Sequence, residues 1–406
     1  MAEVLTFGCR LNTVESEAIR THTAHLPGTF VVNTCAVTAT AERDARHAIA
    51  RLHRDCPGAA IVATGCAVQI DPARWAALPG VTRVLGNAEK LRPEHWHLDA
   101  PSHVAPIAQA TTHHPAPLTG LANRARAFLD VQQGCDHACT FCIIPQGRGA
   151  NRSVPMDEVA AHIRGLVEAG QHEVVLTGVD VASWGSDLPG RLGLAVLLRH
   201  ILARTALPRL RLSSLDPAML DDAFWDILAE ERVMPHLHLS LQAASDLVLK
   251  RMKRRHSRDD AHRAIERARQ ARPGLAIAAD LIAGFPTETD THHAETLNFV
   301  NEAALPYLHV FPYSPRPGTP AARMPQVPLP ERRARAARLR AAAIPHAAAF
   351  HAGLVGRVRT VVAERGSRGH TEEFAPVRGL DAEPGTLVRV HVTASDASGL
   401  EVQPWR

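Results

Sequence analysis

Short apolar runs alternate with longer amphipathic stretches through residue 99 of the chain. Stretches such as 40–54 and 72–78 have the apolar spacing of helices. Because strands and helices alternate, we predict a parallel sheet with helices packed on its faces. The expected strands are residues 4–7, 29–32, 59–63 and 81–85.

The same alternation returns after residue 120 and repeats about six times, once for each strand of a small barrel. Units of this kind predict a partial (β/α)6 barrel, whose chemistry lies at the carboxyl ends of its strands. An Arg- and Ala-rich helix is expected next, from residue 331 to about 343. The expected barrel strands are 127–132, 173–177, 209–213, 236–240, 276–282 and 307–312, with helices such as 156–169, 218–230 and 257–271 between them.

The end of the chain has strands with no helix between them. Residues 357–364, 373–377 and 387–393 look like strands, and glycines mark the turns. This pattern predicts a small all-β domain, built as a five-stranded barrel.

The predicted fold class is therefore α/β, with three domains. We place a parallel α/β domain at residues 1–99, the partial barrel at 121–345 and the all-β domain at 346–406. Residues 100–120 are rich in Pro, Ala, Thr and His without a hydrophobic period, which predicts a linker. We expect its histidines, His113 and His114, to be solvated and not metal ligands.

Composition narrows the class of protein only a little. Of the 406 residues, 46% are hydrophobic and 21% are charged, the balance of a soluble globular chain. The net charge of +4 permits a nucleic-acid partner without requiring one. No apolar run approaches the roughly 18 residues of a membrane span, and the first residues lack the regions of a signal peptide. We expect a cytoplasmic enzyme with no membrane partner and with reduced cysteines.

Three of the seven cysteines, Cys135, Cys139 and Cys142, lie close together after the first expected barrel strand. Three thiolates on one loop can hold three irons of a [4Fe–4S] cluster. With no fourth cysteine nearby, one iron stays open to a chelating small molecule such as S-adenosylmethionine (SAM). Phe141 is a candidate contact for the SAM adenine, with ordinary packing as the alternative.

Cys9, Cys35 and Cys66 each follow an expected strand of the first domain by one to three residues. The carboxyl ends of parallel strands share one edge of a sheet, so these cysteines would converge there. They could bind a second cluster, again with one iron open; three buried structural cysteines are the alternative. Cys56 precedes Pro57 at the opposite edge, and we interpret it as structural.

The cysteine motifs resemble those of the radical-SAM methylthiotransferases, enzymes with an N-terminal cluster domain and a C-terminal TRAM domain. The resemblance covers essentially the whole chain in domain order. It is carried by residues 8–12, 33–38, 64–66, 133–145, 148–149 and 308–314.

Within that family, Arg10 and Leu11 fit the MtaB-type branch, which modifies threonylcarbamoyladenosine next to the tRNA anticodon. Residues 316–324 are similar to the same branch. The same chemistry on isopentenyladenosine, or on an aspartate of a ribosomal protein, is the nearest alternative. A non-catalytic iron–sulfur electron-transfer or RNA-binding protein is the alternative from another class. Its clusters usually have protein thiolates on every iron, which counts against it.

The resemblance implies two [4Fe–4S] clusters, SAM and a radical mechanism. SAM on the cluster of the Cys135 loop would be cleaved after reduction by a donor such as a flavodoxin or ferredoxin. The resulting radical would remove the hydrogen at adenine carbon 2, a bond that no general base could break. The other cluster would hold the sulfur, supplied by a sulfur donor and methylated by another SAM.

Further contacts follow from shorter similarities. Segments containing Thr177, Gly178, Gln242 and Gly284 resemble SAM-binding segments of the family, with tight strand-to-helix connections as the alternative. Two basic runs, at 250–258 and 332–340, are candidate tRNA contacts, with solvated helix faces as the alternative. A terminal β-barrel favours RNA binding. The candidate RNA-binding residues are Lys250, Lys253, Arg254, Arg335 and Arg338.

Overall fold

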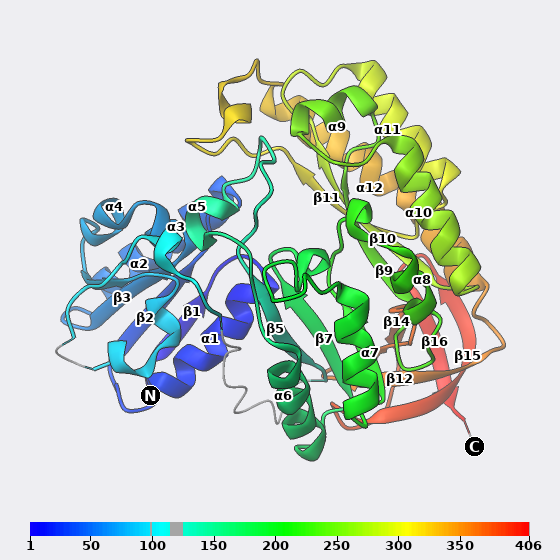
Figure 1. The fold of residues 1–406 in the computed structure, drawn as a ribbon, viewed down its shortest axis with the longest axis horizontal. Coiled ribbons are helices and arrows are strands. Elements are labelled where there is room, and N and C mark those ends of the chain that lie inside the picture. The colour runs from blue at the N-terminus through cyan, green and yellow to red at the C-terminus, as the bar shows by residue number, and fades with distance from the viewer. Residues whose placement is uncertain (98–99, 114–124, 406) are drawn as a thin grey trace.

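The computed structural model describes residues 1–97, 100–113 and 125–405. A parallel sheet with its helices, a larger open barrel and a small closed β-barrel follow one another along the chain (Figure 1). The predicted α/β fold class with these three parts is confirmed.

The N-terminal sheet has four parallel strands in the order β1-β2-β3-β4. Strands β2 and β3 are almost fully buried, as central strands of a parallel sheet are. The strands are β1 (Glu3–Thr6), β2 (Thr29–Thr34), β3 (Ala60–Gly65) and β4 (Val81–Leu85), and the helices are α1 (Arg10–His22), α2 (Ala39–Asp55), α3 (Cys66–Ile70) and α4 (Pro72–Ala76).

Six parallel strands form the open barrel, in two sheets ordered β6-β5-β7-β8 and β11-β10-β9. A parallel bridge between Leu215 and Leu239 connects the two sheets. The short β6 (Arg152–Ser153) pairs antiparallel with β5 and was not predicted. The parallel strands are β5 (Ala127–Gln133), β7 (Glu173–Gly178), β8 (Arg209–Leu212), β9 (His236–Gln242), β10 (Ala276–Ala283) and β11 (Tyr307–Pro312).

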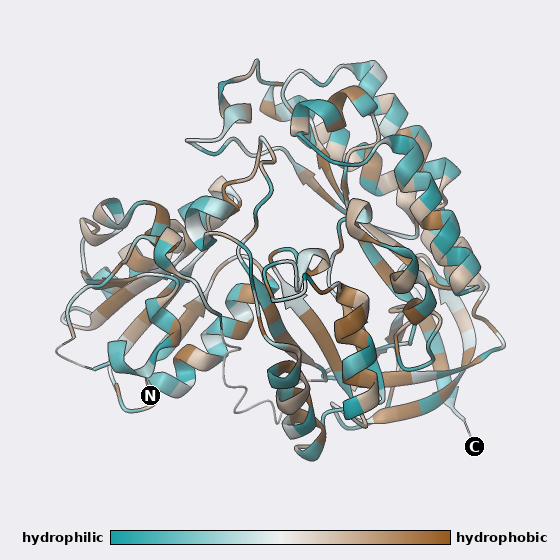
Figure 2. Ribbon diagram, viewed as in Figure 1, coloured by the Kyte–Doolittle hydropathy of each residue, from teal (hydrophilic) through white to brown (hydrophobic). Residues whose placement is uncertain are grey.

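Helices cover the outside of these sheets, and Figure 2 shows the strands beneath them as mainly hydrophobic. The helices are α5 (Ile144–Arg148), α6 (Met156–Glu168), α7 (Leu194–Arg204), α8 (Asp222–Leu228), α9 (Asp246–Met252), α10 (Arg258–Ala271), α11 (Asp290–Glu302) and α12 (Leu329–Ala352). Short 3₁₀ helices lie at η1 (Glu89–Leu91), η2 (Pro93–His95), η3 (Ile107–Gln109), η4 (Val181–Ser183), η5 (Pro217–Met219) and η6 (Pro320–Arg323).

Two helix predictions were wrong in their bounds. The helix expected over 218–230 is split into η5 and α8, because Asp216 and Asp221 each accept a backbone N–H and start a new helix. Helix α12 continues past Pro345, beyond the predicted end near residue 343. The buried His351 is hydrogen-bonded to Tyr307, and such packing offsets the cost of about 3 kcal/mol for proline in a helix.

The C-terminal strands close into the expected five-stranded barrel in the order β12-β13-β14-β16-β15. Two guanidinium groups of β8, on Arg209 and Arg211, donate to the carbonyl of Thr371, so the open barrel and this β-barrel are in contact. The strands are β12 (Val358–Glu364), β13 (Arg368–His370), β14 (Pro376–Arg378), β15 (Leu387–Asp396) and β16 (Gly399–Pro404).

His113 is not a solvated linker residue. It is buried, and its Nε2 lies 2.8 Å from Oδ2 of Asp130 on β5, so the prediction for this histidine was wrong. A buried carboxylate needs polar partners, and the imidazole of His113 packs inward to supply one beside the amide of Gln133. His114 lies outside the described residues. Within the described parts of the chain, no helix is long and apolar enough to cross a membrane.

Candidate active site

The strands of the N-terminal sheet bring three cysteines to one edge. Cys9 occupies the N-cap position of α1, and Cys35 and Cys66 directly follow β2 and β3. Burial, together with the neighbouring Cys66 and Cys9, raises the pKa of the Cys35 thiol to about 12. Three neighbouring thiols of this kind are a donor set that iron would deprotonate on binding.

Glycines allow the cysteine loops to approach one another. Gly8 has φ +95°, and a Cβ there would lie 2.3 Å from the Cβ of Cys35. Gly65 has φ +100°, and a Cβ there would lie 2.3 Å from the carbonyl oxygen of Thr34. The glycines that precede Cys9 and Cys66 are therefore required by the same convergence of strand ends.

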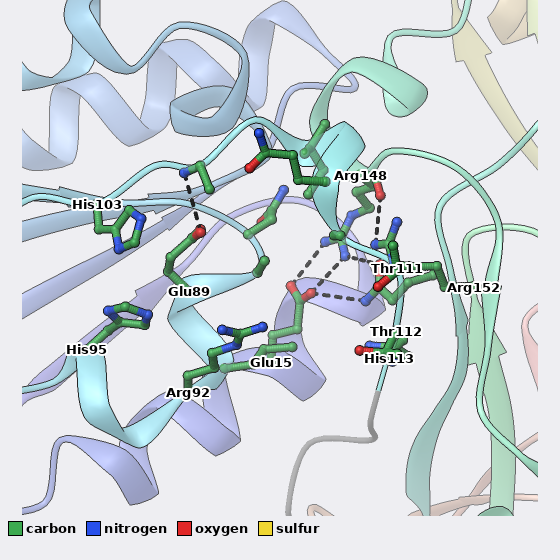
Figure 3. A pocket seen from close by; sticks show the side chains of 18 of the residues that line it. Glu15, Glu89, Arg92, His95, His103, Thr111, Thr112, His113, Arg148 and Arg152 are labelled. Atoms are coloured by element: carbon green, nitrogen blue, oxygen red, sulfur yellow. Dashed lines mark hydrogen bonds and ion pairs between the residues drawn. The ribbon is translucent and has the colours of Figure 1, made fainter.

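One arginine of the barrel reaches the N-terminal cysteines. Arg148 ends α5 and is 2% exposed. Its Nε donates to Sγ of Cys66 at 3.2 Å, its Nη1 to Glu15 at 2.7 Å and its Nη2 to Asn12 at 2.7 Å. Figure 3 shows Arg148 and Glu15 facing each other beside a cavity of about 530 Å³. Arg148 thus connects the two domains at a cysteine.

Glu15 keeps its charge in this buried network. Burial alone would raise the pKa of Glu15, but Arg148 and Lys90 outweigh it and hold the pKa at about 2. The Nζ of Lys90 is fully buried with its side chain and lies 2.7 Å from Oε2 of Glu15. The sequence resemblance included Arg148 without giving it a role. No spacing indicates its partners, which depend on how the domains pack.

The other three cysteines lie on one loop after β5. Gly134 begins this loop with φ +72°. A side chain is excluded there as well, because a Cβ would lie 1.8 Å from the carbonyl oxygen of Ala150. Burial raises the pKa of Cys135 to about 12 and that of Cys142 to about 11, and Cys139 contributes to both. All seven cysteines are described, and no fourth one joins this loop. The donor set fits a cluster with one iron open.

Polar side chains surround this loop. The carboxylate of Asp180 lies 4.0 Å from Sγ of Cys135 and 2.7 Å from Nε2 of His137. Nη1 of Arg254 donates to Sγ of Cys139 at 3.7 Å, so this predicted RNA contact lies at the cysteine loop. Asp180 and His137 were not predicted. Asp180 follows β7 by two residues, where barrel sites gather, so its position could have identified it.

A cavity of about 280 Å³ opens beside Cys142. The predicted cofactor contacts Phe141 and Gln242 both line it, together with Asp280 of β10. Val37 of the N-terminal domain lines it as well, so both cysteine-bearing domains contribute to this space. Phe141 also packs edge-to-face on a second phenylalanine, with ring centroids 6.5 Å apart, so both predicted roles agree with its position.

The remaining predicted cofactor contacts do not line that cavity. Thr177 is buried at the end of β7. A Cβ on Gly178 would lie 2.6 Å from the carbonyl oxygen of Gln132, and one on Gly284 would lie 2.5 Å from Cγ of Arg332. Close packing inside the protein accounts for both glycines, and their contact with a cofactor stays a prediction.

The predicted RNA contacts differ in exposure. Lys250 and Lys253 are exposed at the end of α9. Arg335 is buried and pairs with Glu288 at 2.9 Å, whereas Arg338 is exposed on the same helix. RNA binding by any of them stays a prediction; Arg338 pairs with Glu331 at 2.9 Å, and no ion pair of the two lysines is found among the described residues.

Comparisons with known proteins agree with this site. Residues 129–300 match the family model "Radical SAM superfamily", and residues 2–86 match "Uncharacterized protein family UPF0004". A threonylcarbamoyladenosine tRNA methylthiotransferase MtaB of Rickettsia prowazekii (strain Madrid E) is 42% identical, over 93% of this chain and 90% of the relative. The chain belongs to the radical-SAM methylthiotransferase family. The predicted family resemblance is thereby confirmed.

A relative with another substrate name and a solved structure are also similar to this chain. A tRNA-2-methylthio-N(6)-dimethylallyladenosine synthase of Erythrobacter litoralis (strain HTCC2594) is 36% identical, over 89% of this chain and 86% of the relative. The solved radical SAM methyltransferase TsrM from Kitasatospora setae superposes with a TM-score of 0.56 at 16% identity, covering 77% of this chain and 67% of that chain. At that identity the likeness concerns the fold alone.

Proposed function

We propose that the protein adds a methylthio group to carbon 2 of N6-threonylcarbamoyladenosine next to the tRNA anticodon. The observation that carries this proposal is the pair of three-cysteine sets on adjoining domains, with Arg148 contacting Cys66 between them. Relatives named as threonylcarbamoyladenosine tRNA methylthiotransferases, at 42% and 36% identity, support the choice of base. Isopentenyladenosine is the second candidate, because a synthase for its methylthio derivative is 36% identical.

The proposed cofactors are SAM and two [4Fe–4S] clusters. Cys135, Cys139 and Cys142 would hold the cluster that binds SAM; Cys9, Cys35 and Cys66 would hold the other. When bound, SAM and its cluster supply the radical that can remove hydrogen from an aromatic carbon. The side chains of this protein hold the clusters, exclude water and orient the base beside them.

The proposed partners are tRNA, an electron donor such as a flavodoxin or ferredoxin, and a sulfur donor. Exposed lysines on α9 and the closed β-barrel support an RNA partner. We propose a cytoplasmic location, which a tRNA substrate supports. We assign domains to residues 1–99, 121–345 and 346–406.

The test uses anaerobically reconstituted enzyme, SAM, dithionite and an anticodon stem-loop carrying threonylcarbamoyladenosine. Wild type should form the 2-methylthio nucleoside and 5′-deoxyadenosine. Cys142→Ala should abolish both products, whereas Cys66→Ala should still cleave SAM without methylthiolating the RNA. Cys56→Ala, at the opposite edge of the sheet, is the matched control and should behave as wild type. Methylthiolation by Cys66→Ala would contradict the role of the N-terminal cysteines.

A further inference from the structure

A second cavity, of about 360 Å³, lies between the inner face of the open barrel, α12 and the closed β-barrel. Its lining includes Arg10, Arg211 and Arg340 together with five histidines. Among the described residues that line it, none is an aspartate or a glutamate. Such a lining favours an anionic ligand.

One guanidinium nitrogen in the buried wall of this cavity has no partner among the described residues. Nη1 of Arg211 is buried and has no hydrogen-bond partner in the described part of the chain. Glu173 lies 2.8 Å from Nε of Arg211, but Arg209 at 2.7 Å and Arg126 at 3.1 Å share the same carboxylate. Arg126 also reaches Glu364 at 2.7 Å, so two carboxylates serve three guanidinium groups.

Two further polar groups of the lining lack partners. Arg10 is exposed and lies over the ring of Phe128 at 5.6 Å, and its guanidinium makes no ion pair or hydrogen bond with any described residue. Nδ1 of His236 is buried, also without a hydrogen-bond partner in the described chain. Buried polar groups such as Nη1 of Arg211 and Nδ1 of His236 are normally hydrogen-bonded, so this cavity fits a polar ligand.

Two residues connect this cavity with the surroundings of the cysteine sets. Arg10 directly follows Cys9 in the sequence. Asp280 lines the cavity beside Cys142, and its Oδ1 lies 3.0 Å from Nε2 of His238, which lines the cationic cavity. A molecule that reaches from one cavity to the other therefore passes Asp280.

We propose that this cavity receives the carboxylate of the threonylcarbamoyl arm of the target base, with Arg10 and Arg211 as its cationic partners. The proposal rests on the proposed function and extends it to the feature by which this base is selected. Guanidinium groups match a carboxylate with paired, charge-assisted hydrogen bonds. An RNA phosphate has similar chemistry, and the test separates the two sources.

The test compares three anticodon stem-loops: one with threonylcarbamoyladenosine, one with its carboxylate converted to the methyl ester, and one with unmodified adenosine. All three carry the same phosphates. Reconstituted enzyme without reductant is titrated with each to give Kd, and kcat/KM for methylthiolation is measured separately. Wild type should bind the carboxylate RNA about 10- to 100-fold more tightly than the ester. Arg10→Gln should lose most of that preference, and Arg10→Lys should keep part of it.

The matched control is Arg263→Gln, at an exposed arginine of α10, which should keep the full preference. Equal binding of the acid and the ester by wild type would overturn the proposal, and this measurement needs no variant. An equal loss of affinity for all three RNAs in Arg10→Gln would also overturn it, because the guanidinium would then contact phosphate. Absence of methylthiolation of any RNA by wild type would instead overturn the proposed function, with the binding preference still measurable.

Discussion

All three guanidinium nitrogens of Arg148 donate to buried acceptors. The acceptors on Cys66, Glu15 and Asn12 belong to the N-terminal domain, whereas the arginine follows the cysteine loop of the barrel. Its Nη1 also donates to Gln133 of β5. The residue therefore contributes to stability through Glu15 and to the candidate site through Cys66. Because Glu15 stays ionised, a neutral replacement leaves a buried charge with Lys90 as its remaining cationic partner.

Arg148→Met should lower the free energy of unfolding by about 3 kcal/mol, since it breaks a buried ion pair and leaves acceptors unsatisfied. Urea denaturation of the metal-free protein measures this change. The control is Arg54→Met, an exposed arginine at the end of α2, which should change stability by less than about 0.5 kcal/mol. Equal stability of Arg148→Met and wild type would contradict the account of this network.

At the scale of secondary structure, the turns after the strands decide where the cysteines lie. Parallel strands end at a common edge, so cysteines distant in the sequence meet without any local motif. The turn at Gly8 must be free of a side chain because the next cysteine loop occupies that space. A substitution there therefore affects Cys35, which is far away in the sequence.

Gly8→Ala should lower the iron content of the reconstituted enzyme by about half, because the N-terminal cluster is lost and the barrel cluster is retained. Iron analysis and the spectrum of the reduced protein measure it. Gly58→Ala is the matched control: its φ is similarly positive at +87°, but nothing lies within 4 Å of the added Cβ. Loss of iron in Gly58→Ala but not in Gly8→Ala would contradict the explanation that an added Cβ at residue 8 displaces Cys35.

The ion pairs of Glu173 on β7 with Arg209 and Arg211 on β8 should make the free energy of unfolding depend on pH. Burial raises the pKa of Glu173, but Arg211, Arg209 and Arg126 outweigh it and hold the pKa at about 2, below its ordinary 4.5. The folded carboxylate binds protons less readily than the unfolded one. The resulting stabilisation, roughly 3 kcal/mol, is complete above about pH 4.5 and is lost as the pH falls through 2. Thermal unfolding of wild type and of Glu173→Gln, measured across this pH range, checks the predicted loss of stability. The same dependence of stability on pH in both proteins would contradict it.

At the scale of the whole molecule, the order and class of the domains could be predicted because each has its own hydrophobic period. The positions of the cysteines at strand ends could be predicted for the same reason, because the strands that precede them were visible in the hydrophobic pattern. The contact of Arg148 with Cys66 could not, because it depends on the packing of two domains. The three-residue strand β13 is too short to show a period. The end of α12 was missed because tertiary contacts outweigh the proline.

The modest net charge makes local basic groups decisive for binding tRNA. Lys250→Glu with Lys253→Glu should weaken binding of tRNA and lower the slope of log Kd against log salt by about 2. Filter binding over a range of salt concentrations measures both quantities. Arg54→Glu with Arg51→Glu, at exposed positions of α2, is the matched control. An unchanged slope in the lysine variant would exclude phosphate contacts by α9.

The most direct test of the central claim is mass spectrometry of nucleosides from total tRNA, with and without the gene for this protein. Loss of 2-methylthio-N6-threonylcarbamoyladenosine with accumulation of its unmethylthiolated precursor is the predicted result. It should be reversed by wild type and not by Cys66→Ala. Loss of the isopentenyladenosine derivative instead would contradict the proposed base and leave the chemistry in place. No change in either nucleoside would contradict the proposed function.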